Sequence, residues 1–308
     1  MKASILTMHP GEETTMIAKE QIQIRDPYVL TDEENQCYYL FGSTDKDIWK
    51  GQATGFDAYR SKDLEHWEGP FPAFRPPVGF WSQTNYWAPE VHAYQGRYYM
   101  FATFKADGVC RGTQILVSDR PLGPYVPHSY GPLTPRDWEC LDGTLHVDDE
   151  GQPWMVFCHE WVQVKDGTIC AIPLAKDLSH AIGEPVQLFA ASEAPWVEQV
   201  HSPRHGSGYV TDGPFMYRTG EGKLIMIWSS FRGGRYAQGM AVSESGGIMG
   251  PWKQIEKPLY ESDGGHGMIF RTLDGRIMLA LHTPNKTPEE RAIFIELEEA
   301  DGELRLKS

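Results

Sequence analysis

Short apolar stretches separated by turns recur five times along the chain, and each recurrence has the same layout. An apolar strand opens near an acidic residue or a histidine, a turn follows, and a second strand rich in apolar and aromatic residues comes next. The starts fall at positions 26, 87, 142, 212 and 266, so the intervals are 61, 55, 70 and 54 residues. Glycine beside an acidic or amide residue in several of the turns supplies the positive φ that hairpins need.

A third strand and a surface turn close most of the units, with Gly-Pro as punctuation at 69–70, 123–124 and 250–251. Five units of four short antiparallel strands, with almost no helical periodicity, predict an all-β fold, a five-bladed β-propeller. A two-sheet sandwich is the competing all-β fold, but it does not explain a period near 60 residues. We expect a single catalytic domain over residues 1–308, with about 1–20 as an N-terminal extension or closing segment, because no linker divides the chain.

Composition narrows the class of protein. A net charge of −14 argues against nucleic-acid binding, which needs clustered Lys and Arg. No apolar run reaches the length of a membrane span, and residues 1–16 lack an apolar stretch of signal-peptide length, so we expect a cytoplasmic protein. The five cysteines are scattered without a Cys-x-x-Cys pair, which indicates free thiols rather than zinc ligands or disulfides.

The period itself predicts a site. The innermost strands of a propeller surround the axis, so residues at their starts converge on one face. Glycoside hydrolysis needs two carboxyl groups, one to protonate the leaving oxygen and one on the other face of the bond. A third carboxylate beside the acid raises the pKa of that acid by repulsion between like charges.

The same residues carry a family resemblance. Arg25-Asp26-Pro27-Tyr28, Trp87-Ala88-Pro89-Glu90-Val91, Asp142-Gly143-Thr144-Leu145 and Gly264-Gly265-His266-Gly267 resemble, in order, strand motifs of glycoside hydrolase family 43. The match runs from about residue 22 to 285. The resemblance implies that Asp26 is the general base, Asp142 the residue that adjusts the pKa of the acid, and Asp212 the general acid. It also implies that His266 holds a central ion or water.

One position departs from the family pattern. The family usually has Glu-Gly-Pro at the acid position, whereas this chain has Asp212-Gly213-Pro214. A misplacement of about 1 Å can cost about 100-fold in rate. Three outcomes stay open: the strand lies closer to the substrate, another carboxyl donates the proton, or the protein binds without hydrolysing. Glu160 is the reserve acid, and Glu198 is a weaker one.

Further residues are candidates for substrate binding. Tryptophans expected in loops near the site face can stack on sugar rings, although most tryptophans in propellers pack between blades. Arg232 and Arg235 can reach a sugar hydroxyl or form a solvent-facing turn, and Glu90 is expected to act through hydrogen bonds. The substrate-binding candidates are therefore Trp81, Trp87, Glu90, Trp161, Arg232 and Arg235.

Together with the convergence of acids, the family resemblance implies an inverting glycosidase that cleaves α-L-arabinofuranosides, β-D-xylosides or other furanosides in short oligosaccharides. A retaining fructoside-type hydrolase and a sugar-binding propeller without a working acid are the alternatives. We expect no organic cofactor. The resemblance allows for a structural calcium ion near the axis, at His266. We expect a small glycoside as partner and neither nucleic acid nor membrane; the sequence does not predict an oligomeric state.

Overall fold

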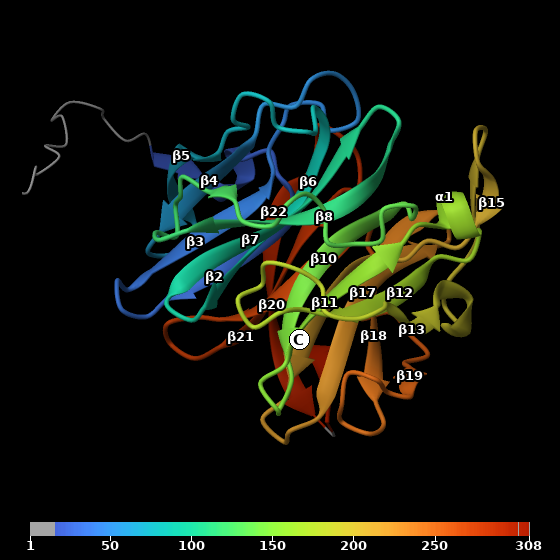
Figure 1. Ribbon diagram of the computed structural model, residues 1–308. Helices are drawn as coiled ribbons and strands as arrows, with labels where there is room; N and C mark the ends of the chain where they lie inside the picture. The colour runs from blue at the N-terminus through green and yellow to red at the C-terminus, as the bar shows by residue number, and fades with distance from the viewer. Residues whose placement is uncertain (1–15, 301, 308) are drawn as a thin grey trace, which may run out of the picture.

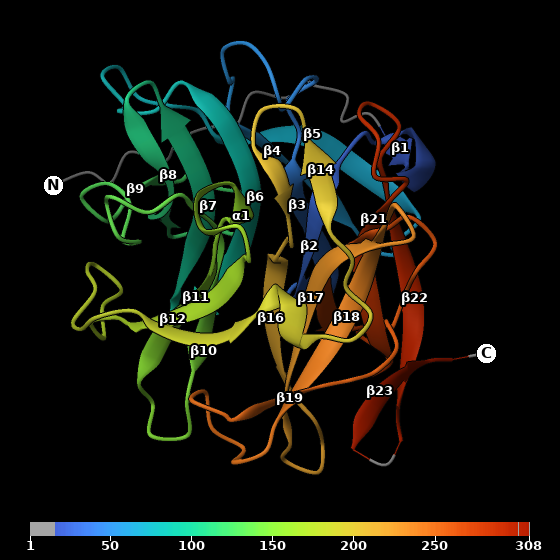
Figure 2. The same cartoon turned by 90° about the vertical axis from the view of Figure 1, so that its right-hand side faces the viewer.

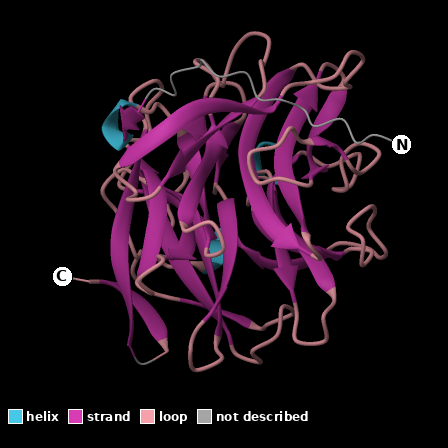
Figure 3. Ribbon diagram, turned by 90° about the vertical axis from the view of Figure 1, so that its left-hand side faces the viewer, coloured by secondary structure: helices cyan, strands magenta, loops and turns pink. Residues whose placement is uncertain are grey.

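The computed structural model describes residues 16–300 and 302–307, which form antiparallel β-sheets with very little helix (Figure 3). Five sheets follow one another along the chain, and their innermost strands contact each other around a common axis. In Figure 1 the first two blades, in blue and teal, lie on one side and the third and fourth, in green to orange, on the other. The predicted five-bladed β-propeller is confirmed.

The first two blades run from the innermost strand outward. The first contains β2 (Arg25–Asp32), β3 (Cys37–Ser43), β4 (Phe56–Ser61), β5 (His66–Phe74) and β1 (Met16–Ala18). The second contains β6 (Thr84–Tyr94), β7 (Arg97–Ala106), β8 (Val109–Ser118) and β9 (Val126–Pro127).

The other three blades have four strands each. The third contains β10 (Cys140–Val147), β11 (Pro153–His159), β12 (Thr168–Pro173) and β13 (Val186–Ala190). The fourth contains β16 (Asp212–Arg218), β17 (Leu224–Arg232), β18 (Arg235–Ser243) and β19 (Trp252–Gln254). The fifth contains β20 (Gly265–Arg271), β21 (Ile277–Thr283), β22 (Arg291–Ala300) and β23 (Glu303–Leu306).

The longest interval of the repeat contains a separate hairpin. It is formed by β14 (Val200–Ser202) and β15 (Gly206–Gly208), and it projects beside the short helix α1 (Trp161–Val164) in Figure 1. The described helices are α1 and two 3-10 turns, η1 (Lys19–Gln21) and η2 (Ala191–Glu193). All five cysteines are free, as predicted.

Every innermost strand contains a β-bulge at the same place. Two residues of the inner strand face one residue of the second strand, and the first of the two has a positive φ. Apart from glycine, this backbone conformation is most often adopted by Asn, Asp and His, and three of the five positions carry Asp or His. In chain order the positions are Asp26 (φ 52°), Ala88 (46°), Asp142 (57°), Gly213 (44°) and His266 (50°).

The second bulge residue explains the Pro and Gly of the repeated motif. Pro27, Pro89 and Pro214 have no N–H, so the bulge leaves no donor unpaired there. In the other two blades the N–H of Gly143 donates to Thr113 Oγ1 (3.1 Å) and that of Gly267 to Gln238 Oε1 (2.7 Å). At each bulge, therefore, the second residue either lacks a backbone N–H or donates it to a side chain.

The first bulge residue ties each blade to the blade before it. Its N–H donates to a side chain of the preceding blade, in four cases that of the second-strand residue paired with the position just before that blade's bulge. The bonds are Ala88 N to Ser43 Oγ (2.8 Å), Asp142 N to Thr103 Oγ1 (2.9 Å), Gly213 N to Asp142 Oδ2 (3.1 Å), His266 N to Ser229 Oγ (2.8 Å) and Asp26 N to His282 Nδ1 (3.2 Å). We call these five hydrogen bonds the inter-blade ring.

The fifth blade meets the first blade by packing and hydrogen bonds rather than by sharing a sheet. The N-terminal strand β1 pairs with β5 on the outside of the first blade, and the fifth sheet is built from C-terminal residues alone. The buried Arg25 forms an ion pair with Glu290 (3.0 Å), and Ile24 N donates to Glu290 O (3.3 Å). Figure 2 shows β1 and β22 at this junction, where Arg291 Nε donates to Glu20 O (2.7 Å).

Candidate active site

Three carboxylates from three blades converge on one histidine nitrogen. Nδ1 of His266 lies 3.2 Å from Oδ1 of Asp26, 3.7 Å from Oδ2 of Asp142 and 3.7 Å from Oδ1 of Asp212. Because its neighbours are acceptor oxygens, Nδ1 carries the hydrogen. The three acids predicted from the repeat are therefore together, and the fifth-blade histidine is at their centre.

Asp26 is held in its ionised form. Ser43 Oγ donates to its Oδ2 (2.7 Å), and its own N–H is bound by His282. Burial alone raises the pKa of Asp26, but His266, Arg25 and the Ser43 hydrogen bond outweigh burial and bring the pKa below its ordinary value. Burial and Arg25 lower the pKa of His282 to about 3, so its ring is neutral and free to accept at Nδ1. An ionised carboxylate is the form that a general base needs.

Asp142 is in the opposite state. It is 5% exposed, and its Oδ2 accepts the N–H of Gly213. Burial, followed by the charge of the neighbouring Asp212, raises the pKa of Asp142 well above its ordinary value. Beside Asp212, Asp142 therefore keeps its proton to higher pH than an ordinary carboxyl does, and the two carboxyls form a proton-holding pair.

Asp212 is the most accessible of the three, with its side chain 24% exposed. Its Oδ2 accepts a hydrogen bond of 2.7 Å from the hydroxyl of Tyr236. The register also corrects the phase of the repeat: the first bulge residue of the fourth blade is Gly213, so Asp212 is aligned with Arg25 and Trp87, one residue earlier than Asp26 and Asp142. Asp212 is therefore displaced by one residue along its strand from the positions of Asp26 and Asp142.

A cavity of about 730 Å³ opens above these groups, and its lining comes from all five blades and from the β14–β15 hairpin. Asp26, Asp142, Asp212 and His266 are among its lining residues. The predicted residues Trp87, Glu160 and Trp161 line it as well. The segment from Glu193 to Ser207 contributes Val200, His201, Arg204 and His205.

Glu160 belongs to a network of alternating charges on one wall. Lys105 Nζ bonds both oxygens of Glu139 (2.8 and 2.9 Å), the N–H of Arg111 donates to Glu139 (2.9 Å), and the Arg111 guanidinium forms an ion pair with Glu160. Burial raises the pKa of Glu160 despite Arg111, and its second oxygen is buried with no partner among the described residues. The charge of Glu160 is therefore paired with that of Arg111. Glu160 is not among the carboxylates that lie within ion-pair distance of His266.

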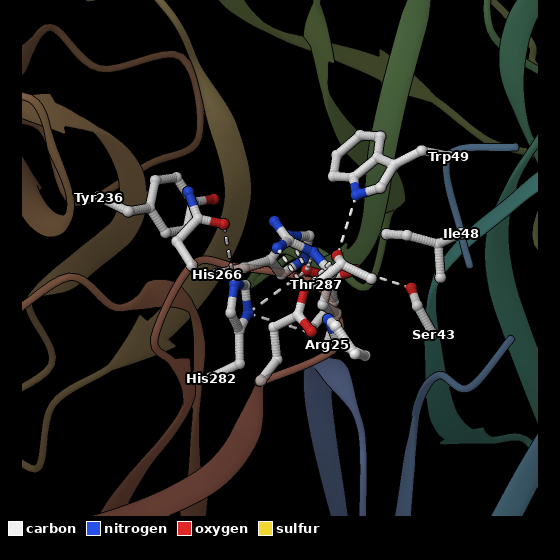
Figure 4. A network of polar contacts seen from close by, with 12 residues as sticks. Arg25, Ser43, Ile48, Trp49, Tyr236, His266, His282 and Thr287 are labelled. Carbon is white, nitrogen blue, oxygen red and sulfur yellow. Dashed lines mark hydrogen bonds and ion pairs between the residues drawn. The ribbon is translucent and has the colours of Figure 1, made fainter. Parts of the chain in front are cut away.

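Two tryptophans form another wall. Trp87 has the Arg111 guanidinium 4.3 Å from its ring centroid, and Trp49 packs edge-on against Trp87 (5.1 Å). Trp49 is half exposed and donates from Nε1 to Thr287 Oγ1 (2.9 Å). Figure 4 shows Trp49, Ile48 and Ser43 on one side of Arg25, and Tyr236, His266 and His282 on the other. Such an aromatic surface suits the apolar face of a sugar ring.

Other predicted residues lie outside the cavity lining. Trp81 donates to Gln114 Oε1 (2.6 Å) and packs on Phe104. Glu90 lies past the bulge of its strand, buried beside His92 (3.1 Å). Arg232 is exposed and pairs with Glu261 (3.3 Å), Arg235 is exposed in the same hairpin, and Glu198 binds the N–H of Gly233 (3.0 Å).

The sequence reasoning missed several residues of the site. Arg111 and Tyr236 lie near the starts of third strands, and Trp49 lies in the loop after β3, where the repeat predicts no functional position. The missed residues that shape the cavity are Arg25, Trp49, Lys105, Arg111, Glu139 and Tyr236. A charged or aromatic residue next to a strand end on the site face was the available signal.

The cluster also offers donor atoms for a cation. Asp142, Asp212 and His266 each present one ligand atom, and these atoms lie within 4.8 Å of one another. Calcium takes six to eight oxygen ligands, which can include waters, so these residues would supply only part of its coordination. The calcium ion expected near the axis stays a prediction.

Comparisons with known proteins agree with this geometry. The sequence profile of Glycosyl hydrolases family 43 matches residues 21–300. The chain is 24% identical over 294 residues to the extracellular exo-α-(1→5)-L-arabinofuranosidase ArbA of Cellvibrio japonicus, covering 85% of this chain and 79% of that protein.

Solved structures are also similar to this chain. A structure described as endo-arabinase from Bacteroides thetaiotaomicron is 45% identical, with a TM-score of 0.87 over 94% of this chain and 99% of that one. A thermostable family-43 glycoside hydrolase is 24% identical with a TM-score of 0.77, over 93% of each chain, and shows the shared fold. The described residues contain no helix long and apolar enough to cross a membrane. The profile match spans most of the chain, and the chain therefore belongs to glycosyl hydrolase family 43 and is a glycosidase.

Proposed function

We propose that this glycosidase hydrolyses α-L-arabinofuranosidic bonds in short oligosaccharides, with inversion at the anomeric carbon. The observation that carries the proposal is the convergence of Asp26, Asp142 and Asp212 on His266 at the floor of a sugar-sized cavity. The relatives named as an arabinofuranosidase and an endo-arabinase favour arabinofuranosides over β-D-xylosides. The Cellvibrio relative is named as an exo enzyme and the Bacteroides structure as an endo enzyme, so we propose neither mode of attack for this chain.

The roles follow from the protonation states. Asp26, ionised and fixed by Ser43, deprotonates the attacking water. Asp212, the accessible member of the proton-holding pair, protonates the leaving oxygen, and Asp142 keeps that proton on the pair by its raised pKa. Glu160 remains the reserve acid, and its ion pair with Arg111 counts against it.

The spacing of the carboxyls does not separate inversion from retention. Asp26 Oδ1 and Asp212 Oδ1 lie 3.2 Å and 3.7 Å from the same nitrogen, so they are no farther apart than these lengths combined. This upper limit admits both the separation of about 5–5.5 Å of retaining enzymes and the lower end of the range of about 6.5–9.5 Å of inverting enzymes, so inversion is proposed from the resemblance of the motifs. The anomer of the first product, followed by NMR, separates the two mechanisms.

The assignment of the acid is tested with two aryl α-L-arabinofuranosides, one with a good and one with a poor leaving group. We expect Asp212→Asn to lose about 100-fold or more on the poor leaving group and far less on the good one, because only the poor one needs a proton. Asp26→Asn should lose activity on both substrates. If Glu160→Gln shows the leaving-group dependence and Asp212→Asn does not, the acid is Glu160.

One broader outcome and one open prediction remain. No turnover by the wild-type protein on arabinofuranosides and xylosides would favour a sugar-binding propeller. The cytoplasmic location predicted from residues 1–16 stays a prediction, because residues 1–15 lie outside the described part of the chain and the Cellvibrio relative is described as extracellular.

A further inference from the structure

Tyr236 stands beside Asp212 without a role in the proposed mechanism. It lies near the start of β18, lines the cavity, and is 1% exposed. Its hydroxyl donates to Asp212 Oδ2 at 2.7 Å. A buried phenol with a single short bond to a carboxylate has little freedom to choose another partner, so it determines where that oxygen lies.

Three contacts hold the Tyr236 ring in place. The ring stacks on His282, with centroids 5.6 Å apart and planes at 26°. A Cβ on Gly265 would lie 2.7 Å from the ring, so the absence of a side chain there lets the ring approach. The N–H of Tyr236 donates to Asp263 Oδ1 (3.2 Å), which fixes the backbone. Figure 4 shows Tyr236 beside His266 and His282.

Asp212 needs such support because its side chain is short. The family motif resembled by this strand has Glu where Asp212 stands, so the carboxyl here lies about one methylene nearer its own backbone. The N–H of Gly213, next in the chain, binds Asp142 rather than Asp212. In the described structure the Asp212 carboxyl has the Tyr236 hydroxyl as its hydrogen-bond donor of normal length, and His266 Nδ1 at a longer 3.7 Å.

We propose that Tyr236 is a positioning residue for the proton donor: its hydroxyl fixes Oδ2 of Asp212 and directs Oδ1 toward the reacting oxygen, replacing the reach of a longer acid. This inference rests on the proposed role of Asp212. The groups that face the pair are Asp142 from β10, Asp26 and Arg25 from β2, His266 from β20 and His282 from β21. Of these groups, Asp142 shares a proton with Asp212, whereas Tyr236 is the neighbour whose hydroxyl donates to Asp212 without itself being part of the acid pair.

The test compares Tyr236→Phe with the wild type on the two aryl arabinofuranosides and across pH. Phenylalanine keeps the ring and its stacking on His282, so the fold is retained. We expect kcat on the poor leaving group to fall about 10- to 100-fold, since a carboxyl displaced by about 1 Å loses on that order. The loss on the good leaving group is small. KM changes little for either substrate, because no contact with substrate is removed.

The pH profile adds a readout that a packing defect does not move. The Tyr236 hydroxyl stabilises the ionised Asp142–Asp212 pair, so its removal shifts the alkaline limb of kcat/KM upward by about one pH unit. Replacement of Tyr236 by 3-fluorotyrosine keeps ring and hydroxyl but makes a more acidic donor, and the limb should move downward. This second variant tests the same bond if Tyr236→Phe is unstable.

Tyr217→Phe is the matched control. Tyr217 also donates to a carboxylate, Glu299 Oε1 (2.6 Å), but at the far end of the fourth blade. It should leave the leaving-group dependence and the limb unchanged. If Asp212→Asn behaves as an acid variant while Tyr236→Phe matches the wild type in both readouts, the inference is wrong and the proposed function stands. If the wild type does not hydrolyse glycosides at all, the proposed function itself fails.

Discussion

At the scale of single residues, the same side-chain type has its pKa shifted in opposite directions at two positions of the site. Asp26, Asp142 and Asp212 are all aspartates, and the chain sequence around them predicts a shared site. Their protonation differs because His266, Arg25 and Ser43 surround the first, whereas burial and a second carboxylate surround Asp142. The sequence identifies the acids, but only the neighbours brought by other blades decide which acid is charged.

Asp142 should lower the stability of the fold at neutral pH. Its pKa is raised in the folded state, so the folded protein binds more protons than the unfolded chain, and this group's contribution to stability is lost as pH rises above the unfolded value of about 3.8. Asp142→Asn removes the penalty while its amide oxygen can still accept the Gly213 N–H. We expect the melting temperature of the variant to exceed that of the wild type at pH 7 and to converge with it near pH 4.

The difference in the free energy of unfolding between Asp142→Asn and the wild type can grow by at most about 1.4 kcal/mol per pH unit. It stops growing once the pH reaches the pKa of Asp142 in the folded protein. Glycosidase activity of the variant should fall at every pH, since the proton-holding pair is broken. A melting temperature unchanged or lowered at pH 7 would contradict the raised pKa. Glu298→Gln in β22, a carboxyl on an exposed strand, provides the control.

At the scale of elements, the bulge is the feature that turns a strand into part of the site. It gives the first bulge residue a positive φ and an N–H that must be satisfied by the preceding blade. In blades one, two, four and five the acceptor is Ser43, Thr103, Ser229 or His282, and in the third blade the corresponding position is Cys158, a weak acceptor. There Asp142 accepts instead, so a catalytic candidate also completes the inter-blade ring.

Breaking one bond of the ring should destabilise the propeller. Thr103→Val keeps the shape of a fully buried side chain but leaves the N–H of Asp142 unpaired. A buried donor without a partner costs about 1–3 kcal/mol, so we expect the free energy of unfolding in urea to fall by that amount. The control is Thr31→Val, which loses an exposed bond of 2.6 Å to Arg271 O and should change stability by less than about 1 kcal/mol. Equal losses of stability in the two variants would show that a hydrogen bond of the inter-blade ring contributes no more to stability than an exposed one.

At the scale of the whole molecule, closure between the last and first blades rests on buried polar contacts. The two blades share no sheet, and the described junction contains the Arg25–Glu290 pair, in which Glu290 is 1% exposed, together with the Asp26–His282 hydrogen bond. The junction therefore contains both Asp26, the proposed general base, and the contacts that close the ring of blades.

Removing one member of this pair should weaken closure. Glu290→Gln removes the nearer carboxylate partner of the buried Arg25 and leaves Asp26 at 3.9 Å, and breaking a buried pair costs up to about 3–5 kcal/mol. We expect a lower melting temperature and faster hydrogen exchange in β2 and β20, with smaller changes in the third blade. Glu68→Gln, which breaks the partly exposed pair with Arg60, should cost less than about 1 kcal/mol. A uniform loss of protection across all five blades would argue against a local role in closure.

The sequence by itself determined the number of blades and the three acids, because both follow from a local pattern: a strand, a turn, and a bulge whose Pro or Gly satisfies the backbone. It also placed His266 with the acids. It did not predict that Asp212 lies one residue before the bulge of its strand, or that Glu90 lies past it and out of the cavity. Those outcomes depend on register, which the pairing of two strands sets.

The cavity walls were decided by the tertiary structure alone. Tyr236, Arg111 and Trp49 lie at strand ends and in a loop with no shared motif, and they reach the site because closing five twisted sheets around an axis brings those ends together. The protonation states have the same origin, since charge and burial are properties of the assembled neighbours. A repeat along the chain fixes which residues face the axis, and the packing of blades fixes what each of them meets there.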